Sequence, residues 1–273
     1  SDKIVLGTDD LCKTYGGTGF INRSREVKAA QDVSIKLMKG RTLGIVGESG
    51  SGKSTVARCI MRLIDPTSGS ITVGGKDIAT LSQRELKPQR KNIQIVFQDP
   101  MRSLNPRIEV GKSIIEGPLN FGVPQAQAMD RARELLELVG LPASAVDRFP
   151  HQFSGGQRQR IAIARALAMD PDVLVADEAV SALDVSVQAQ VLDLLAELQE
   201  RLGLGILFIT HDLGVAAQIC DEVLVMQYGR VVEYGPAAQV LGSPQQDYTK
   251  ALISAAPGRH WDFANFRPFA EAT

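Results

Sequence analysis

A glycine-rich segment at residues 47–55 constrains the fold of this chain more than any other feature. Its letters, GESGSGKST, fit the pattern G-x-x-x-x-G-K-[ST]. The apolar run Thr42–Val46 directly before it predicts a buried parallel strand, and apolar residues at helical spacing predict a helix over residues 55–63. Such a loop presents free backbone N–H groups and the positive end of a helix dipole. The segment therefore predicts a cradle for phosphate groups.

Individual residues of this loop have expected roles. Lys53 is long enough to reach the β- and γ-phosphates of a nucleotide, and the Ser54 hydroxyl can ligate Mg²⁺. The other members are expected to surround the phosphates mainly through backbone N–H groups: Gly47, Glu48, Ser49, Gly50, Ser51, Gly52 and Thr55. The alternative is a strand-to-helix turn without a ligand. We disfavour it because every fixed position of the pattern is present in the expected strand–loop–helix context.

Composition narrows the class of protein. The 273 residues are 44% hydrophobic and 22% charged, which suffices for an α/β core. The net charge of −1 gives no overall field that would recruit nucleic acid. The cysteines Cys12, Cys59 and Cys220 form no CxxC pair, which predicts reduced thiols in a cytosolic setting. No apolar run approaches the roughly 18 residues of a membrane span, and three aspartates in residues 1–10 argue against a signal peptide.

The rest of the chain alternates strand-like and helix-like patterns, without an internal repeat. Strands are expected at residues 4–11, 33–37, 69–73, 93–97, 173–176, 206–209, 223–226 and 231–234, the last two as a hairpin. Helices are expected at residues 81–86, 110–121, 125–139, from 153 onward, at 187–202 and, initially, after 236. The polar excursion at residues 16–28 is expected to be a solvated loop, and residues 261–273 show no clear period.

Polar side chains follow several of the predicted strands. Asp177 and Glu178 end one, His211 follows the next along the chain, and Gln98 follows residues 93–97. Ligands of open parallel sheets bind at the carboxyl ends of the strands. Asp177 is expected to hold Mg²⁺ through a water, and Glu178 to polarise the attacking water. Alternatively, the two acids only cap the next helix. His211 and Gln98 are weak signals alone, although a Gln98 amide oxygen could ligate Mg²⁺.

A second glycine-rich helix start provides a second anion site. It consists of Ser154, Gly155, Gly156 and Gln157, with Ser154 as the expected N-cap. It lies inside a helical insert, too far along the fold from Lys53 to share one phosphate within a single chain. Two such sites suggest a head-to-tail dimer in which each chain closes over the nucleotide of the other.

Together these residues resemble the nucleotide-binding subunit of ATP-binding-cassette (ABC) transporters, over nearly the whole chain. By this resemblance the loop is the Walker A motif, Asp177 ends Walker B, and Glu178 is catalytic. The remaining motifs follow in the same way: Gln98 in the Q-loop, Ser154 to Gln157 in the signature motif, Asp184 in the D-loop, His211 as the switch histidine and Tyr15 as the adenine-stacking aromatic.

The resemblance implies an α/β P-loop NTPase with a RecA-like core. An N-terminal antiparallel β subdomain and an inserted α-helical subdomain would complete a single ABC ATPase domain over residues 1–273. The expected boundaries are 1–98 and 160–235 for the nucleotide-binding core, 99–159 for the helical signature subdomain and 236–273 for a C-terminal extension of the peptide-importer type.

Three segments resemble the ATPases of peptide and nickel importers, of the oligopeptide and dipeptide type: 97–100 (FQDP), 103–107 (SLNPR) and 243–252 (SPQQDYTKAL). Gln246-Asp247 departs from the usual His-Pro of that subfamily, and Ala179-Val180 from the commoner Pro-Thr of ABC proteins. The form DEAVSALD is familiar in the second ATPase of this subfamily, including C-terminal halves of tandem chains. No cysteine follows Cys220, so no iron–sulfur cluster is expected.

The implied activity is ATP hydrolysis with Mg²⁺, in which two cassettes enclose two ATP molecules and drive two membrane permease subunits. An extracytoplasmic solute-binding protein would take part indirectly, and nucleic acid would not. The expected location is peripheral, on the cytoplasmic face of the bacterial inner membrane. The competing interpretations are a soluble ABC ATPase acting on nucleic acid or the ribosome, and a regulatory subunit with a degenerate site. The transported substrate and the choice between homodimer and heterodimer stay open.

Overall fold

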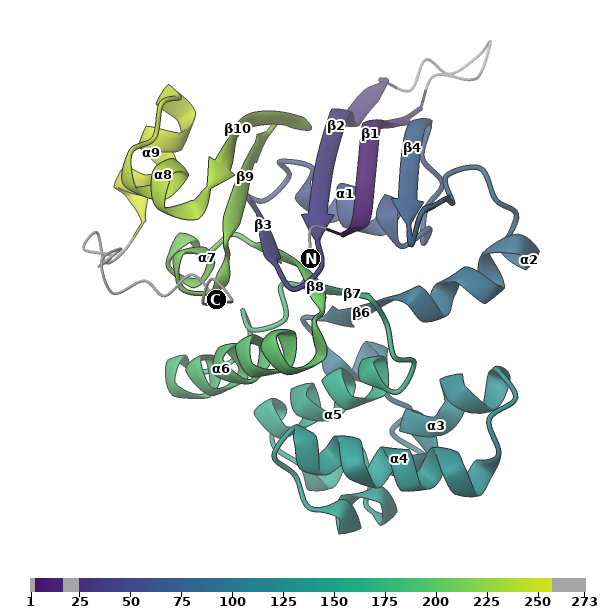
Figure 1. The fold of residues 1–273 in the computed structure, drawn as a ribbon. Coiled ribbons are helices and arrows are strands. Elements are labelled where there is room, and N and C mark those ends of the chain that lie inside the picture. The colour runs from purple at the N-terminus through teal and green to yellow at the C-terminus, as the bar shows by residue number, and fades with distance from the viewer. Residues whose placement is uncertain (1–2, 17–24, 257–273) are drawn as a thin grey trace.

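Short, mostly apolar runs form the centre of the fold as a sheet whose neighbouring strands are all parallel except in the last hairpin. The computed structural model describes residues 3–16 and 25–256. Within them, a six-stranded sheet has the order β10-β9-β3-β8-β7-β6 (Figure 1). Its strands are β3 (Thr42–Val46), β6 (Ile93–Phe97), β7 (Val173–Asp177), β8 (Gly205–Thr210), β9 (Glu222–Gln227) and β10 (Arg230–Pro236). Every residue of β3, β7 and β8 is buried, as expected for parallel strands covered on both faces.

An antiparallel sheet covers one face of this core. It has the order β2-β1-β4-β5 and consists of β1 (Ile4–Tyr15), β2 (Val27–Met38), β4 (Ser68–Val73) and β5 (Lys76–Asp77). Its inward side chains share one hydrophobic cluster with α1 (Lys53–Ile60) and with one face of the central sheet. Helix α1 is thus held by apolar contacts, and it carries the end of the phosphate loop.

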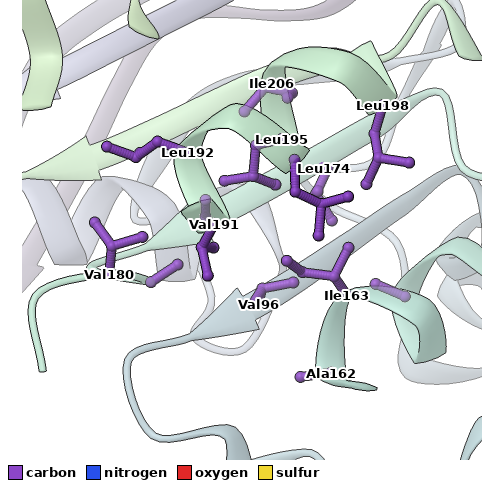
Figure 2. Close-up of a cluster of buried hydrophobic side chains, with 14 of the residues drawn as sticks. Val96, Ala162, Ile163, Leu174, Val180, Val191, Leu192, Leu195, Leu198 and Ile206 are labelled. Carbon is purple, nitrogen blue, oxygen red and sulfur yellow. The ribbon is translucent and has the colours of Figure 1, made fainter. Parts of the chain in front are cut away.

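Helices cover the other face. They are α5 (Gly155–Leu167), α6 (Val185–Leu202) and α7 (Leu213–Ile219). Beyond them, α3 (Val110–Asn120) and α4 (Gln125–Leu138) pack against α5 and against each other (Figure 1). Figure 2 shows Leu195 and Leu198 of α6 near Leu174 and Ile206 of the sheet, with Ile163 of α5 nearby. Three short helices complete the fold: α2 (Gln83–Leu86), α8 (Ala237–Gly242) and α9 (Asp247–Ala255). No described helix is both long enough and apolar enough to cross a membrane.

Most expected elements are present, and the differences have local causes. Helix α1 begins at Lys53 rather than at residue 55, because Gly52 adopts a left-handed backbone (φ 102°) and serves as its N-cap. Strand β2 begins at Val27, so Lys28 lies in a strand and not in the expected loop; residues 17–24 of that excursion lie outside the described residues. Helix α7, N-capped by Asp212, was not expected. Residues 261–273 also lie outside the described part.

Candidate active site

The register of the parallel strands places the polar strand ends along one edge of the sheet. Neighbouring strands pair at or within one residue of their ends: Val46 with Thr210, Ile209 with Asp177, and Asp177 with Phe97. The residues that follow the strands therefore lie along one edge in the order of the strands, namely Gly47, His211, Glu178 and Gln98. Polar residues from four separate segments thus come together because the strands end at the same level of the sheet.

A cavity of about 860 Å³ opens at this edge. Most of the glycine-rich loop lines it, together with Glu178 and His211: Gly47, Glu48, Ser49, Gly50, Gly52, Lys53, Ser54 and Thr55. Ser51 differs, since its side chain is buried and is not part of the lining. Its backbone fixes the loop instead, because the Ser51 N–H donates to the Glu48 carbonyl and the Ser51 carbonyl accepts from Gly229. The cavity has the size of a small-molecule site.

Gly52 is required by the packing of the loop as well as by its backbone conformation. A Cβ at this position would collide with the Ala29 carbonyl oxygen of β2 and lie 3.0 Å from the Gly229 Cα in the β9–β10 turn. The loop is therefore held between the antiparallel sheet and that turn. This contact explains how a segment rich in glycine keeps one conformation.

Three charged or polar side chains meet inside the cavity. The Lys53 Nζ donates to the Glu48 carbonyl at 3.3 Å and lies 3.8 Å from the Glu178 Oε1. The His211 Nδ1 is 3.1 Å from both carboxylate oxygens of Glu178. Glu178 itself has φ 54°, a strained value for a residue with a side chain. Its N–H donates to Ile209, and its carbonyl accepts from the Ser181 N–H and Oγ–H. The surrounding hydrogen bonds thus hold the Glu178 carboxylate between Lys53 and His211.

Asp177 is the buried acid of the site. Burial raises its pKa above the ordinary 3.8, the neighbouring charge of Glu178 raises it further, and the charges of Arg58, Arg102 and Lys53 act in the opposite direction. A nearby divalent cation would offset the penalty of ionising this carboxylate.

The donors at this edge fit Mg²⁺. Ser54 in the first turn of α1 and Asp177 at the end of β7 are hard oxygen donors. The described residues contain no cluster of three or more His, Cys, Asp or Glu side chains that could form a complete cage. A cation here would take its other ligands from phosphate and water, as Mg²⁺ does readily. Gln98 is exposed at the end of β6 and is not among the residues lining the cavity.

The second glycine-rich helix start lies outside the cavity. Its Ser154 Oγ accepts from the Gln157 N–H, and the Gln157 Oε1 accepts from the Ser154 N–H, which forms a reciprocal capping box. A Cβ on Gly156 would collide with the Val187 side chain of α6. Ser154, Gly155 and Gln157 are exposed. Their polar groups therefore face outward from this chain, and none of them lines the cavity with Lys53.

Two further expected residues are not brought into the cavity. The Tyr15 ring is half-exposed, with the Lys13 Nζ 5.0 Å from its centroid, and does not belong to the lining. Asp184 takes the N-cap position of α6, but its side chain makes no capping hydrogen bond. It is exposed, three residues after Ser181, whose hydroxyl donates a hydrogen bond to the Glu178 carbonyl.

The structure adds residues that the sequence did not indicate for the site. Val27, Lys28, Ala29 and the turn residues Tyr228 and Gly229 line the cavity. Tyr228 is 79% exposed, which is unusual for an aromatic side chain. The sequence shows only that Tyr228 lies in a predicted hairpin turn, and this does not indicate a place in the site. From α9, Leu252 lines the cavity and the Tyr248 Oη accepts from the Glu48 N–H at 3.5 Å. These contacts join segments 200 residues apart, so no local pattern could reveal them.

Comparisons with known proteins agree with this geometry. The family model described as ABC transporter matches residues 30–181. The chain is 50% identical to the dipeptide transport ATP-binding protein DppF of Escherichia coli over 256 residues, 93% of this chain and 76% of the relative. It is also 50% identical to DppF of Haemophilus influenzae over 241 residues, 88% of this chain and 73% of the relative.

Solved structures give the same result. The cbiO1 protein of Clostridium perfringens, part of the ABC transporter complex cbiONQ, matches with a TM-score of 0.77 and 31% identity over 93% of this chain and 94% of that one. A dimeric post-hydrolysis structure of the ATP-binding cassette MJ0796, bound to ADP and Pi, matches with a TM-score of 0.73 and 31% identity over 85% of this chain and 98% of that one. The expected α/β P-loop fold is confirmed, and this chain belongs to the ABC transporter family of ATP-binding proteins.

Proposed function

We propose that this chain is the ATP-binding and ATP-hydrolysing subunit that energises an ABC importer for peptides or a related small solute. The observation that carries the proposal is the meeting of Lys53, Glu178 and His211 in the cavity lined by the glycine-rich loop. These groups place a phosphate-binding lysine and a general base together at the carboxyl ends of the parallel strands. The relatives named for dipeptide transport support the choice of solute class.

In this proposal the loop residues bind the phosphates of ATP. The backbone N–H groups and Lys53 neutralise charge on the β- and γ-phosphates. Glu178 accepts a proton from the attacking water, and His211, 3.1 Å from Glu178, orients the carboxylate and contacts the γ-phosphate. Ser54, Asp177 and Gln98 would hold Mg²⁺, which would supply positive charge against the negative charge of the phosphates. We assign stacking on the adenine ring to Tyr15 by the family pattern alone.

The second half of the site comes from another cassette. The start of α5 would contact the γ-phosphate of the nucleotide bound to the partner, through Ser154, Gly155, Gly156 and Gln157. Asp184 would lie at the same interface. ATP then favours the closed dimer because it binds that state more tightly than the open one. Residues 99–159 would move with this helix start, and two permease subunits on the cytoplasmic face of the membrane would respond.

Affinity purification from native membranes tests the transport assignment. The tagged chain is solubilised in mild detergent, and its partners are identified by mass spectrometry. A Lys53→Ala chain serves as a control for partners that require ATP. We expect two permeases, a cassette partner and a peptide-type binding protein. Ribosomal or nucleic-acid proteins in their place would leave the ATPase assignment standing and contradict transport.

A further inference from the structure

The mechanism leaves one fully buried polar side chain of α5 without a role. Gln159 is 0% exposed. Its amide nitrogen donates two hydrogen bonds, to the Phe97 carbonyl at 2.8 Å and to the Ala179 carbonyl at 2.5 Å. Within the described part of the chain, its Oε1 has no hydrogen-bond partner. A buried amide with an unpaired oxygen is uncommon and calls for an explanation.

Both acceptors belong to segments that carry catalytic groups. Phe97 is the last residue of β6 and directly precedes Gln98. Ala179 directly follows Glu178, whose backbone is held at φ 54°. The Glu178 peptide is otherwise held by the Ile209 carbonyl and by Ser181. Gln159 therefore completes the set of bonds that keeps the strained backbone around Glu178 in place.

The helix that carries Gln159 begins at the second glycine-rich site. Gln159 lies in the second turn of α5, five residues after its N-cap Ser154. An α-helix transmits a displacement along its axis as a rigid unit. A shift of Ser154 to Gln157 would therefore act on the Phe97 and Ala179 carbonyls through a single side chain.

We propose that Gln159 is a positioning residue that couples the helix start contacting one nucleotide to Gln98 and Glu178 of the other site. This inference rests on the proposed function, in which Ser154 to Gln157 contact the nucleotide of the partner. Contact at α5 then sets the position of the Glu178 carboxylate on the opposite side of the same chain, so hydrolysis in the two sites is linked through α5.

The experiment compares two buried glutamines. Gln159→Met removes both N–H donors at similar length and volume. Gln199→Met is the matched control: Gln199 is also buried, donates to the Thr42 Oγ1 at the start of β3, and also has an unpartnered Oε1. Gln159→Glu, a change of one atom, replaces the first variant if it does not fold. ATPase kinetics, mant-ADP affinity and melting temperature are measured for each in the assembled transporter.

We expect Gln159→Met to lower kcat by at least about tenfold, because the geometry of the base changes. The Kd of mant-ADP should stay within about twofold of wild type, because the Glu178 carboxylate keeps its charge beside Lys53. Gln199→Met should leave kcat within about twofold at a comparable loss in melting temperature. Equal kcat in both variants would overturn the coupling role. In the Glu178→Gln background, Gln159→Met should have no further effect on turnover. Full turnover of Glu178→Gln alone would instead overturn the base assignment in the proposed function.

Discussion

The ion pair between Lys53 and Glu178 makes the affinity for nucleotide depend on a carboxylate that does not bind it. The charges are 3.8 Å apart, and the side chains are only 7% and 16% exposed. At an effective dielectric constant of 20, such a pair is worth about 4 kcal/mol before desolvation and screening. Desolvation of the two charges offsets most of this attraction, and Glu178 keeps its contact with His211 when Lys53 turns to a phosphate. We therefore expect the pair to weaken nucleotide binding by about 1.4 kcal/mol. A nucleotide phosphate must compete with this carboxylate for Lys53.

Glu178→Gln should therefore tighten mant-ADP binding by about tenfold while lowering kcat by at least about 100-fold. Mant-ADP fluorescence measures the affinity without interference from hydrolysis, and phosphate release measures kcat. The matched control is Glu197→Gln on the outer face of α6, where Glu197 pairs with Arg201. It removes the same charge and should change neither value by more than about twofold. Unchanged or weaker mant-ADP binding by Glu178→Gln would refute the competition argument, and near-normal turnover would refute the role of Glu178.

Two further predictions concern stability. Because burial raises the pKa of Asp177, ionising it weakens the folded state as pH rises above about 4. Asp177→Asn should raise Tm by about 1–3 °C at pH 7.5 without Mg²⁺, and this gain should disappear near pH 4. The variant should not hydrolyse ATP. A Tm below that of wild type at pH 7.5 would contradict the stability argument. Leu195→Ala, in the cluster of Figure 2, should lower the unfolding free energy in urea by about 2–5 kcal/mol. The half-exposed Leu202→Ala should lose less than about 1 kcal/mol, and equal losses would refute the core assignment.

The edge of the site could be predicted from local patterns, because each part is encoded within a few residues. The run Thr42–Val46 forms β3 as expected, and the acids after Ala176 lie at the end of β7. The expectation that strand ends meet needed only the rule for parallel sheets. The pairing of Val46 with Thr210 shows why it succeeded, since the strands end level.

Contacts between distant segments could not be predicted from the same patterns. The contact of Tyr248 with Glu48 depends on where α9 packs. Gln159 has the polarity of a surface residue, and only the crossing of α5 over the ends of β6 and β7 buries it. Ser51 matched the loop pattern, yet its side chain faces the interior. Propensity and spacing describe one segment at a time, whereas these positions are set by packing between segments.

The proposed function requires each hydrolytic site to be shared by two chains. A mixed cassette dimer in which only the tagged chain carries Ser154→Arg tests it most directly. After turnover of radiolabelled azido-ATP and photocrosslinking, the chains are separated by the tag, and the ratio of ADP to ATP is measured on each. We expect hydrolysis to be lost on the untagged partner, whereas ADP should still form on the chain that carries Ser154→Arg, at a rate lowered by the altered contact at the start of its own α5. Loss confined to the tagged chain would contradict it.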